Sequence, residues 1–197
     1  MSKVKACVFA SGTGSNFQAI IESENLNCEI VLLVCDKPGA RVIEIAEKYS
    51  IPTFVFHPKD YTSKAVYEKI LVEKLKSAGV TWVFLAGYMR LIGPELLDTY
   101  EGKIVNIHPS LLPDFPGKDA IGQAFQAGVD KTGVTIHFVD AGMDTGPVIA
   151  QESVEVLEND TIHTVTARIQ KIEHTLYPKV INQLINESEA TLCAKEL

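Results

Sequence analysis

Short apolar runs alternate with amphipathic segments along most of the chain. Runs typical of β-strands lie at residues 5–10, 29–34, 53–56, 82–86, 104–107, 133–139 and 148–156. The central runs lack polar residues at alternate positions, which indicates strands that are covered on both faces. Helical patterns fill the segments between them, most clearly where apolar residues recur at three- and four-residue steps. The predicted helices lie at residues 16–23, 40–49, 67–78, 94–99, 120–127 and 162–176.

Strands that alternate with helices are typical of a parallel α/β sheet. We therefore predict an α/β fold with a single doubly wound, mostly parallel sheet and helices on both faces, over residues 1–186. Pro178 is expected to end or kink the last helix, because proline lacks the N–H that a helix interior uses. Residues 187–197 are expected to form an unpatterned tail.

Length and composition narrow the possible functions. The 197 residues, of which 46% are hydrophobic, suffice for one globular domain and leave no room for a second large one. A net charge of −7 argues against a nucleic-acid-binding surface, although a local cluster of backbone N–H groups can still hold a small anion. Residues 1–5 have no signal-peptide pattern, and no apolar run reaches the roughly 18 residues of a membrane span. We predict a cytoplasmic monomer or weak homodimer without nucleic-acid or membrane partners.

The cysteines show neither metal-site nor redox spacing. Cys7, Cys28, Cys35 and Cys193 form no C-x-x-C pair, and the first three lie inside apolar runs. Free cysteines in such runs behave as small buried hydrophobic residues. We predict reduced, buried thiols and no bound metal.

Four loops that follow predicted strands are candidate ligand-binding segments, because doubly wound sheets bind ligands at the carboxyl ends of their strands. They are residues 11–16, 87–93, 106–117 and 140–146. In a fully parallel sheet these loops would share one edge. We expect the chemistry of the protein to lie there.

The first of these loops, residues 11–16 with the sequence SGTGSN, is suited to an anion. Small residues let backbone N–H groups approach a phosphate at a helix N-terminus. The donors would come from Gly14, Ser15 and Asn16. A tight turn capped by Ser15 is the alternative. A dinucleotide site also stays open, since Asp36 lies near the expected distance for a ribose-binding acid, although Phe17 replaces the third glycine of that motif.

The segment around His108 is suited to stabilising an oxyanion. Strand alternation places Asn106 and His108 on the same side, where an amide and an imidazole can address one carbonyl oxygen. Asp144 is a candidate partner for His108, whereas Asp140 fits a turn residue bonded to its own loop. A lone histidine is more often structural, and the spacing alone does not bring Asp144 to His108. No serine elbow occurs and no cysteine adjoins the histidine, so direct attack by a substrate group is favoured over a covalent intermediate.

Four motifs then follow one another along the chain: GTGSN at 12–16, AGYMR at 86–90, NIHPSLLP at 106–113 and DTGP at 144–147. In this combination the chain resembles the folate-dependent formyltransferases, from about residue 3 to residue 185. NIHPSLLP is highly specific to that superfamily. The likeness is greatest to members that formylate 5-phosphoribosylglycinamide (GAR), in purine biosynthesis. It implies a Rossmann-like formyltransferase fold and transfer of the formyl group of 10-formyltetrahydrofolate to the GAR amine, by direct attack through a tetrahedral intermediate.

The resemblance also assigns roles to residues. Asn106 and His108 would bind the formyl oxygen, while Asp144 would keep His108 protonated and help a water molecule to carry the amine proton. The residues that would hold the ribonucleotide are Gly14, Ser15, Asn16 and Glu173. The residues that would bind the folate are Lys64, Met89, Arg90, Leu91, Ile92, Asn106, Val139, Asp140 and Asp144. Lys64 stands where many members carry arginine, so only the charge is preserved.

Related enzymes with other acceptors are expected to be larger. Members that formylate methionyl-tRNA add a C-terminal domain and basic surfaces, and deformylases of formyl-folate add an N-terminal regulatory domain. This acidic chain shows neither feature, which favours GAR as the acceptor. A formyltetrahydrofolate deformylase and a non-catalytic nucleotide-binding module stay open as alternatives.

Overall fold

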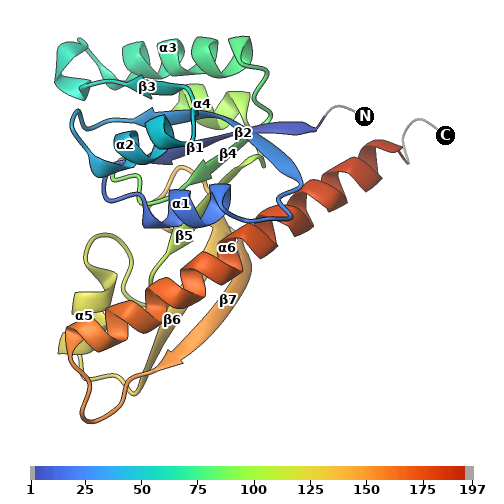
Figure 1. Ribbon diagram of the computed structural model, residues 1–197. Helices are drawn as coiled ribbons and strands as arrows, with labels where there is room; N and C mark the ends of the chain where they lie inside the picture. Colours follow the sequence, from blue (N-terminus) through green and yellow to red (C-terminus); the bar gives the residue numbers. More distant parts are fainter. Residues whose placement is uncertain (1–2, 194–197) are drawn as a thin grey trace.

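A single seven-stranded sheet organises the protein (Figure 1). The computed structural model describes residues 3–193, apart from the side chains of residues 192 and 193. The strands are β1 (Val4–Ala10), β2 (Cys28–Cys35), β3 (Thr53–Val55), β4 (Trp82–Leu85), β5 (Ile104–His108), β6 (Lys131–Phe138) and β7 (Val148–Glu155). The helices are α1 (Ser15–Ile21), α2 (Arg41–Lys48), α3 (Lys64–Ser77), α4 (Pro94–Thr99), α5 (Ala120–Gln126) and α6 (Ile162–Cys193), with a short 3₁₀ turn, η1, at Pro58–Asp60.

The order of the strands is β3-β2-β1-β4-β5-β6-β7. The first five strands pair in parallel, and β6 and β7 are antiparallel. The prediction of one doubly wound, mostly parallel sheet is confirmed. Every predicted strand and helix is present, and η1 is the addition.

Each face of the sheet is covered by its own hydrophobic core. On β1, Ala6 and Val8 belong to the core shared with α1, α2 and α6, whereas Cys7 and Phe9 belong to the core shared with α3 and α4. All four side chains are fully buried. Burial on both faces is the physical reason why the central strands read as unbroken apolar runs.

The last helix is longer than predicted. α6 continues through Pro178 to Cys193, so the expected helix end at Pro178 is wrong, and residues 187–193 are helical rather than an unpatterned tail. Proline removes one backbone hydrogen bond, but the turns beyond it stay attached to the core because their apolar side chains are buried. These side chains are Val180, Ile181, Leu184 and Ile185.

Three of the four cysteines match the prediction of reduced, buried thiols. Cys7, Cys28 and Cys35 are free and buried. Burial raises the pKa of Cys28 to about 12, which keeps its thiol protonated and unreactive. The side chain of Cys193 lies outside the described residues, as do Met1 and Ser2 at the other terminus. Within residues 3–193, none of the helices combines the length and apolar character needed to cross a membrane.

One loop does not leave the sheet where a fully parallel arrangement would place it. β6 runs antiparallel to β5, with Phe138 opposite Val105 and Thr135 opposite His108. The loop after β6 therefore starts beside the amino end of β5, where the Val139 N–H donates to the Ile104 carbonyl at 3.0 Å. The expectation of one shared edge is wrong for this loop, which has to fold back along β5 to reach His108.

Candidate active site

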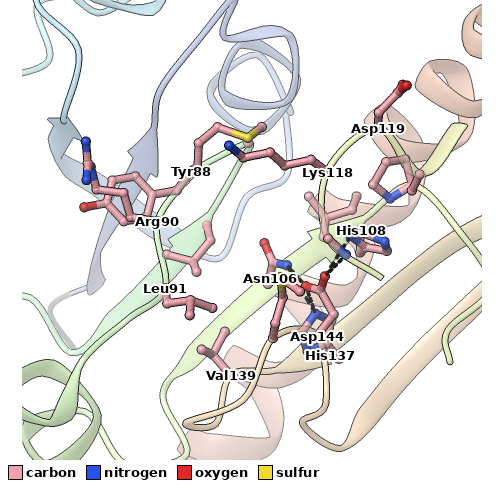
Figure 2. A pocket seen from close by; sticks show the side chains of 18 of the residues that line it. Tyr88, Arg90, Leu91, Asn106, His108, Lys118, Asp119, His137, Val139 and Asp144 are labelled. Carbon is pink, nitrogen blue, oxygen red and sulfur yellow. Dashed lines mark hydrogen bonds and ion pairs between the residues drawn. The ribbon is translucent and has the colours of Figure 1, made fainter. Parts of the chain in front are cut away.

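A cavity of about 640 Å³ lies above the carboxyl ends of β4 and β5 (Figure 2). Its lining combines residues 87–92, residues 106–109, residues 117–121 and parts of the loop after β6. Eleven of the predicted site residues line it: Asn16, Met89, Arg90, Leu91, Ile92, Asn106, His108, Val139, Asp140, Asp144 and Glu173. Three predicted site residues, Gly14, Ser15 and Lys64, are not in the lining.

Asp144 is the centre of a polar cluster at one end of this cavity. Its Oδ2 accepts a hydrogen bond from the Gly117 N–H at 2.7 Å and lies 3.5 Å from His108 Nδ1. Its Oδ1 accepts from Asn106 Nδ2 at 3.4 Å and lies 3.6 Å from His137 Nε2. The structure therefore brings together the three side chains, Asn106, His108 and Asp144, for which the sequence predicted a joint role (Figure 2).

Both ring nitrogens of His108 face acceptors. Nε2 lies 2.9 Å from the Phe115 carbonyl oxygen, and Nδ1 faces the Asp144 carboxylate. A carbonyl and a carboxylate can only accept, so an imidazolium with protons on both nitrogens satisfies this arrangement. The His108 side chain is only 7% exposed, so the carboxylate acts on it with little screening by solvent.

The carboxyl group of Asp144 is held in its ionised form. Burial by itself raises its pKa, but the hydrogen bonds from His137 and the Gly117 N–H and the charge of His108 outweigh burial and lower it. Asp144 thus stays negative at neutral pH. It is a fixed negative charge next to two histidines and one amide.

The loops that carry these groups adopt conformations that most side chains avoid. Asp144 has φ of 57°, and Phe115, whose carbonyl meets His108, has φ of 54°. A bulky residue in the left-handed region costs about 1–2 kcal/mol, which the rest of the fold must offset. Strain at both partners of His108 is typical of a site in which geometry matters more than local stability.

His137 belongs to the same cluster, although the sequence analysis assigned it no role. Its Nδ1 lies 2.8 Å from the Phe138 carbonyl oxygen, which places a proton on Nδ1. Its Nε2 lies 3.1 Å from Asn106 Nδ2 and 3.6 Å from Asp144 Oδ1, so the ring restricts the position of the Asn106 side chain. The signal that identifies it is the pairing of Asn106 with His137 across β5 and β6, which depends on the register of two antiparallel strands.

The segment between β4 and α4 forms one wall of the cavity. Met89 and Leu91 are 63% and 52% exposed, whereas Ile92 is buried beneath them. The main-chain N–H groups of Arg90, Leu91 and Ile92 donate to none of the described residues, so they are available to a ligand. This wall therefore offers apolar surface and hydrogen-bond donors side by side, as a flat heteroaromatic ring requires.

Asp36 does not face the cavity. Its Oδ1 accepts a hydrogen bond from Ser11 Oγ and its Oδ2 from Arg90 Nε, both at 2.5 Å. Its side chain is 6% exposed, and it is absent from the lining residues described for the cavity. Both carboxylate oxygens are thus occupied, which removes the observation that had kept a dinucleotide-binding site open.

The glycine loop approaches the cavity through its last residue. Gly14 has φ of 80°, and a Cβ there would lie 2.7 Å from the Val42 side chain, so the turn requires glycine. Asn16, at the start of α1, donates from Nδ2 to Glu173 Oε2 on α6 at 3.1 Å. Asn16 Oδ1 is buried without a hydrogen-bond partner among the described residues. An unsatisfied buried acceptor beside the cavity indicates a place where a ligand can donate a hydrogen bond.

Glu173 is a buried carboxyl group on α6. It is 7% exposed, and burial raises its pKa to about 7, with the Asn16 hydrogen bond acting in the opposite direction. It therefore changes protonation near neutral pH. A carboxyl group in this state can either accept from or donate to a ligand hydroxyl.

Lys64 and Asp140 have local partners. Lys64, at the start of α3, lies 3.8 Å from Glu68 and is not among the residues that line the cavity. Asp140 accepts hydrogen bonds from the Gly142 N–H at 3.0 Å and from Thr145 Oγ1 at 2.7 Å, which is the turn role that its position suggested. It also lines the cavity, so the two interpretations of Asp140 are compatible.

The segment around the start of α5 contributes cavity residues of which the sequence analysis had included only Gly117, at the end of the 106–117 loop. Gly117, Lys118, Asp119 and Ala120 are in the lining, and Figure 2 shows Lys118 and Asp119 across the cavity from Leu91. Only Gly117 contacts the central cluster. No motif in the sequence marked these residues, because their role follows from where the loop ends and not from its residue types.

The chain is similar to known proteins over nearly its whole length. A model of the formyl transferase family matches residues 4–181. A phosphoribosylglycinamide formyltransferase of Bacillus subtilis is 57% identical over 184 residues, which are 92% of this chain and 94% of that protein. The trifunctional purine biosynthetic protein adenosine-3 of Drosophila melanogaster is 40% identical over 92% of this chain, a match that spans 14% of the fly protein.

Solved structures agree with these matches. The crystal structure of glycinamide ribonucleotide transformylase 1 from Geobacillus kaustophilus superposes with a TM-score of 0.91 at 57% sequence identity. The match covers 93% of this chain and 100% of that chain. The likeness therefore extends to the fold of nearly the whole chain.

Proposed function

The chain belongs to the formyl transferase family, and we propose that it transfers the formyl group of 10-formyltetrahydrofolate to the amine of 5-phosphoribosylglycinamide, giving formyl-GAR and tetrahydrofolate. The observation that carries the proposal is the meeting of Asn106, His108 and Asp144 at one cavity that also reaches Asn16 and Glu173. The high identity to enzymes named for this reaction supports the choice of substrates.

Asn106 and His108 would stabilise the formyl oxygen. When the GAR amine attacks the formyl carbon, that oxygen gains negative charge, which an amide donor and a nearby imidazolium offset in a site with little solvent. Asp144 would hold His108 in its charged form and orient it through the 3.5 Å contact with Nδ1. His137 would orient the Asn106 amide from the opposite side.

The proton balance closes without a covalent enzyme intermediate. The bond from the amine nitrogen to the formyl carbon forms, the bond from that carbon to N10 of the folate breaks, and the amine loses one proton that N10 gains. Asp144 is the ionised group close enough to assist this proton through a bound water molecule, because its pKa is lowered and it adjoins the cavity.

The size and the lining of the cavity support a formyl-folate as co-substrate. This ligand would supply the formyl group and the nitrogen that leaves it. Met89, Arg90, Leu91 and Ile92 would bind its ring along the wall described above, and Val139 and Asp140 would form the opposite wall. Lys64 would attract the carboxylates of its tail from the start of α3, as a point charge outside the cavity.

The ribonucleotide would occupy the end of the cavity near α1. Gly14, Ser15 and Asn16 would hold its phosphate through backbone N–H groups. Glu173 would bind ribose hydroxyls, a role supported by its burial and by the unpaired Asn16 oxygen beside it. GAR and formyl-folate would together occupy the cavity, so the proposed reaction needs no nucleic-acid or membrane partner. A reducing compartment such as the cytoplasm suits the three buried free thiols.

One experiment separates this function from its alternatives. The protein is mixed with 10-formyltetrahydrofolate, with and without GAR, and the release of tetrahydrofolate is followed. Release that depends on GAR supports transfer to the amine. Equal release without GAR would identify a deformylase, and tight nucleotide binding without any turnover would identify a binding module.

A further inference from the structure

The cavity wall between β4 and α4 is an irregular segment, residues 87–93, that is tied down at both ends by buried carboxylates from other elements. Asp36 follows β2 and holds Arg90, and Glu68 lies on α3 and holds Gly93. We propose that Asp36 and Glu68 are positioning residues that keep this segment in the shape that binds formyl-folate. The inference rests on the proposed function, since it concerns the binding of that co-substrate.

The Asp36 end is a closed set of hydrogen bonds. Ser11 Oγ donates to Asp36 Oδ1 at 2.5 Å and accepts from the Met89 N–H at 2.9 Å, while Arg90 Nε donates to Asp36 Oδ2 at 2.5 Å. Ser11 is itself fixed to the segment, because its N–H donates to the Gly87 carbonyl at 3.1 Å. Two consecutive residues of the cavity wall are thereby fixed from behind, one through its main chain and one through its side chain.

The direction of Arg90 follows from this arrangement. Figure 2 shows its side chain extending away from Asn106, His108 and Asp144. With the guanidinium turned towards Asp36, the main chain of residues 90–92 is left to face the cavity. Arg90 would thus serve formyl-folate mainly through its backbone, and the sequence reason for an arginine here is its ion pair with Asp36.

The Glu68 end is buried more deeply. Glu68 is 1% exposed, and its Oε1 accepts from the Gly93 N–H at 2.7 Å. A Cβ at Gly93 would collide with the Glu68 carboxylate, so the close approach depends on glycine. The only ionic neighbour described for Glu68 within bridging distance is Lys64, 3.8 Å away. Burial raises the pKa of Glu68, and the Gly93 N–H and Lys64 offset only part of that rise.

Burying these two carboxylates lowers the stability of the fold, so stability alone does not explain why they are there. A buried charge is unfavourable unless it is fully paired, and one oxygen of Glu68 has no partner among the described residues. The benefit lies in the segment they hold, because an irregular loop fixed before binding loses less conformational freedom when the ligand arrives. Loosening either end should therefore weaken formyl-folate binding and leave the chemical step intact.

The test uses Asp36→Asn and Glu68→Gln in the full chain. We expect each to raise the KM for 10-formyltetrahydrofolate on the order of tenfold, since each weakens a hydrogen bond to a charged group. The kcat at saturating folate and the KM for GAR should stay within about twofold of wild type, because the Asn106, His108 and Asp144 cluster is untouched. Binding of folic acid, an unreactive analogue, is measured by calorimetry and should weaken in parallel.

Glu73→Gln is the matched control. Glu73 is an exposed carboxylate on α3, the helix that carries Glu68. It should leave all three constants unchanged. Ser11→Ala is a milder second variant, because it removes a single oxygen atom and with it the hydrogen bond from the Met89 N–H. It replaces Asp36→Asn in the test if that variant does not fold.

The outcomes separate the inference from the function. An unchanged KM for formyl-folate in folded variants would overturn the positioning role, as would equal losses in kcat and in both KM values. If wild-type protein fails to formylate GAR, the proposed function fails instead. The folded state is checked by the midpoint of thermal unfolding.

Discussion

Replacing Asp144 with asparagine removes the negative charge on which the cluster depends and keeps its shape. At 3.5 Å from His108, and with an effective dielectric constant of about 20, the Coulomb attraction amounts to about 5 kcal/mol. Desolvation of the two charges offsets part of this attraction. We expect a net loss of about 3 kcal/mol in transition-state stabilisation, which lowers kcat on the order of a hundredfold.

The fold should survive this change, because an asparagine oxygen can still accept from the Gly117 N–H. Steady-state kinetics with both substrates, together with thermal unfolding, are the measurements. The KM for GAR should change little, since Asn16 and Glu173 bond to each other and not to Asp144. Asp98→Asn, an exposed carboxylate on α4, serves as the control and should retain wild-type kcat.

The pH dependence gives a second readout on the same variant. The pKa of Asp144 is lowered in the folded protein, so its contribution to stability is present above its unfolded pKa near 4 and is lost as the pH falls through the folded value. Wild type should therefore lose stability in acid more steeply than Asp144→Asn. A folded Asp144→Asn protein with wild-type kcat at neutral pH would refute the role of Asp144 as counter-ion of His108.

Three further changes test other parts of the site. Glu173→Gln should stabilise the protein by about 3 kcal/mol at pH 8 but not at pH 4, because the folded pKa of about 7 lies above the unfolded value and the wild type loses stability as the pH rises between the two. Urea unfolding at both pH values is the measurement, and equal effects would contradict burial of the charge. The same variant should raise the KM for GAR. Gly14→Ala should destabilise by about 1–3 kcal/mol in urea unfolding, because its Cβ would meet Val42 at 2.7 Å with φ of 80°, and an unchanged midpoint would refute the requirement for glycine. His137→Ala should lower kcat on the order of tenfold by freeing the Asn106 amide, and full activity in a folded variant would make His137 purely structural.

The pattern of apolar and polar residues predicted the sheet. It also predicted which side chains of a single strand, β5, belong to the active site. Parallel strands buried on both faces leave unbroken apolar runs, and β1 and β4 are such runs. Alternation alone placed Asn106 and His108 on one side, because residues two apart in a strand point the same way. These inferences needed only local geometry.

Contacts that depend on strand direction and register could not be predicted. Asp144 reaches His108 although β6 is antiparallel, and His137 meets Asn106 because the two strands pair at that position. The pairing joins residues 31 apart, and a shift by one residue would turn His137 to the other face. The continuation of α6 beyond Pro178 is a similar case, since burial of later residues outweighs the local effect of proline.

The central claim is that the formyl group leaves the folate and becomes attached to the amine of GAR at this cavity. The most direct test supplies 10-formyltetrahydrofolate with a ¹³C-labelled formyl group and follows the products by mass spectrometry and NMR. We expect labelled formyl-GAR and tetrahydrofolate in equal amounts with wild type, and a much slower appearance of both with Asp144→Asn. Label recovered as free formate while GAR stays unmodified would contradict it.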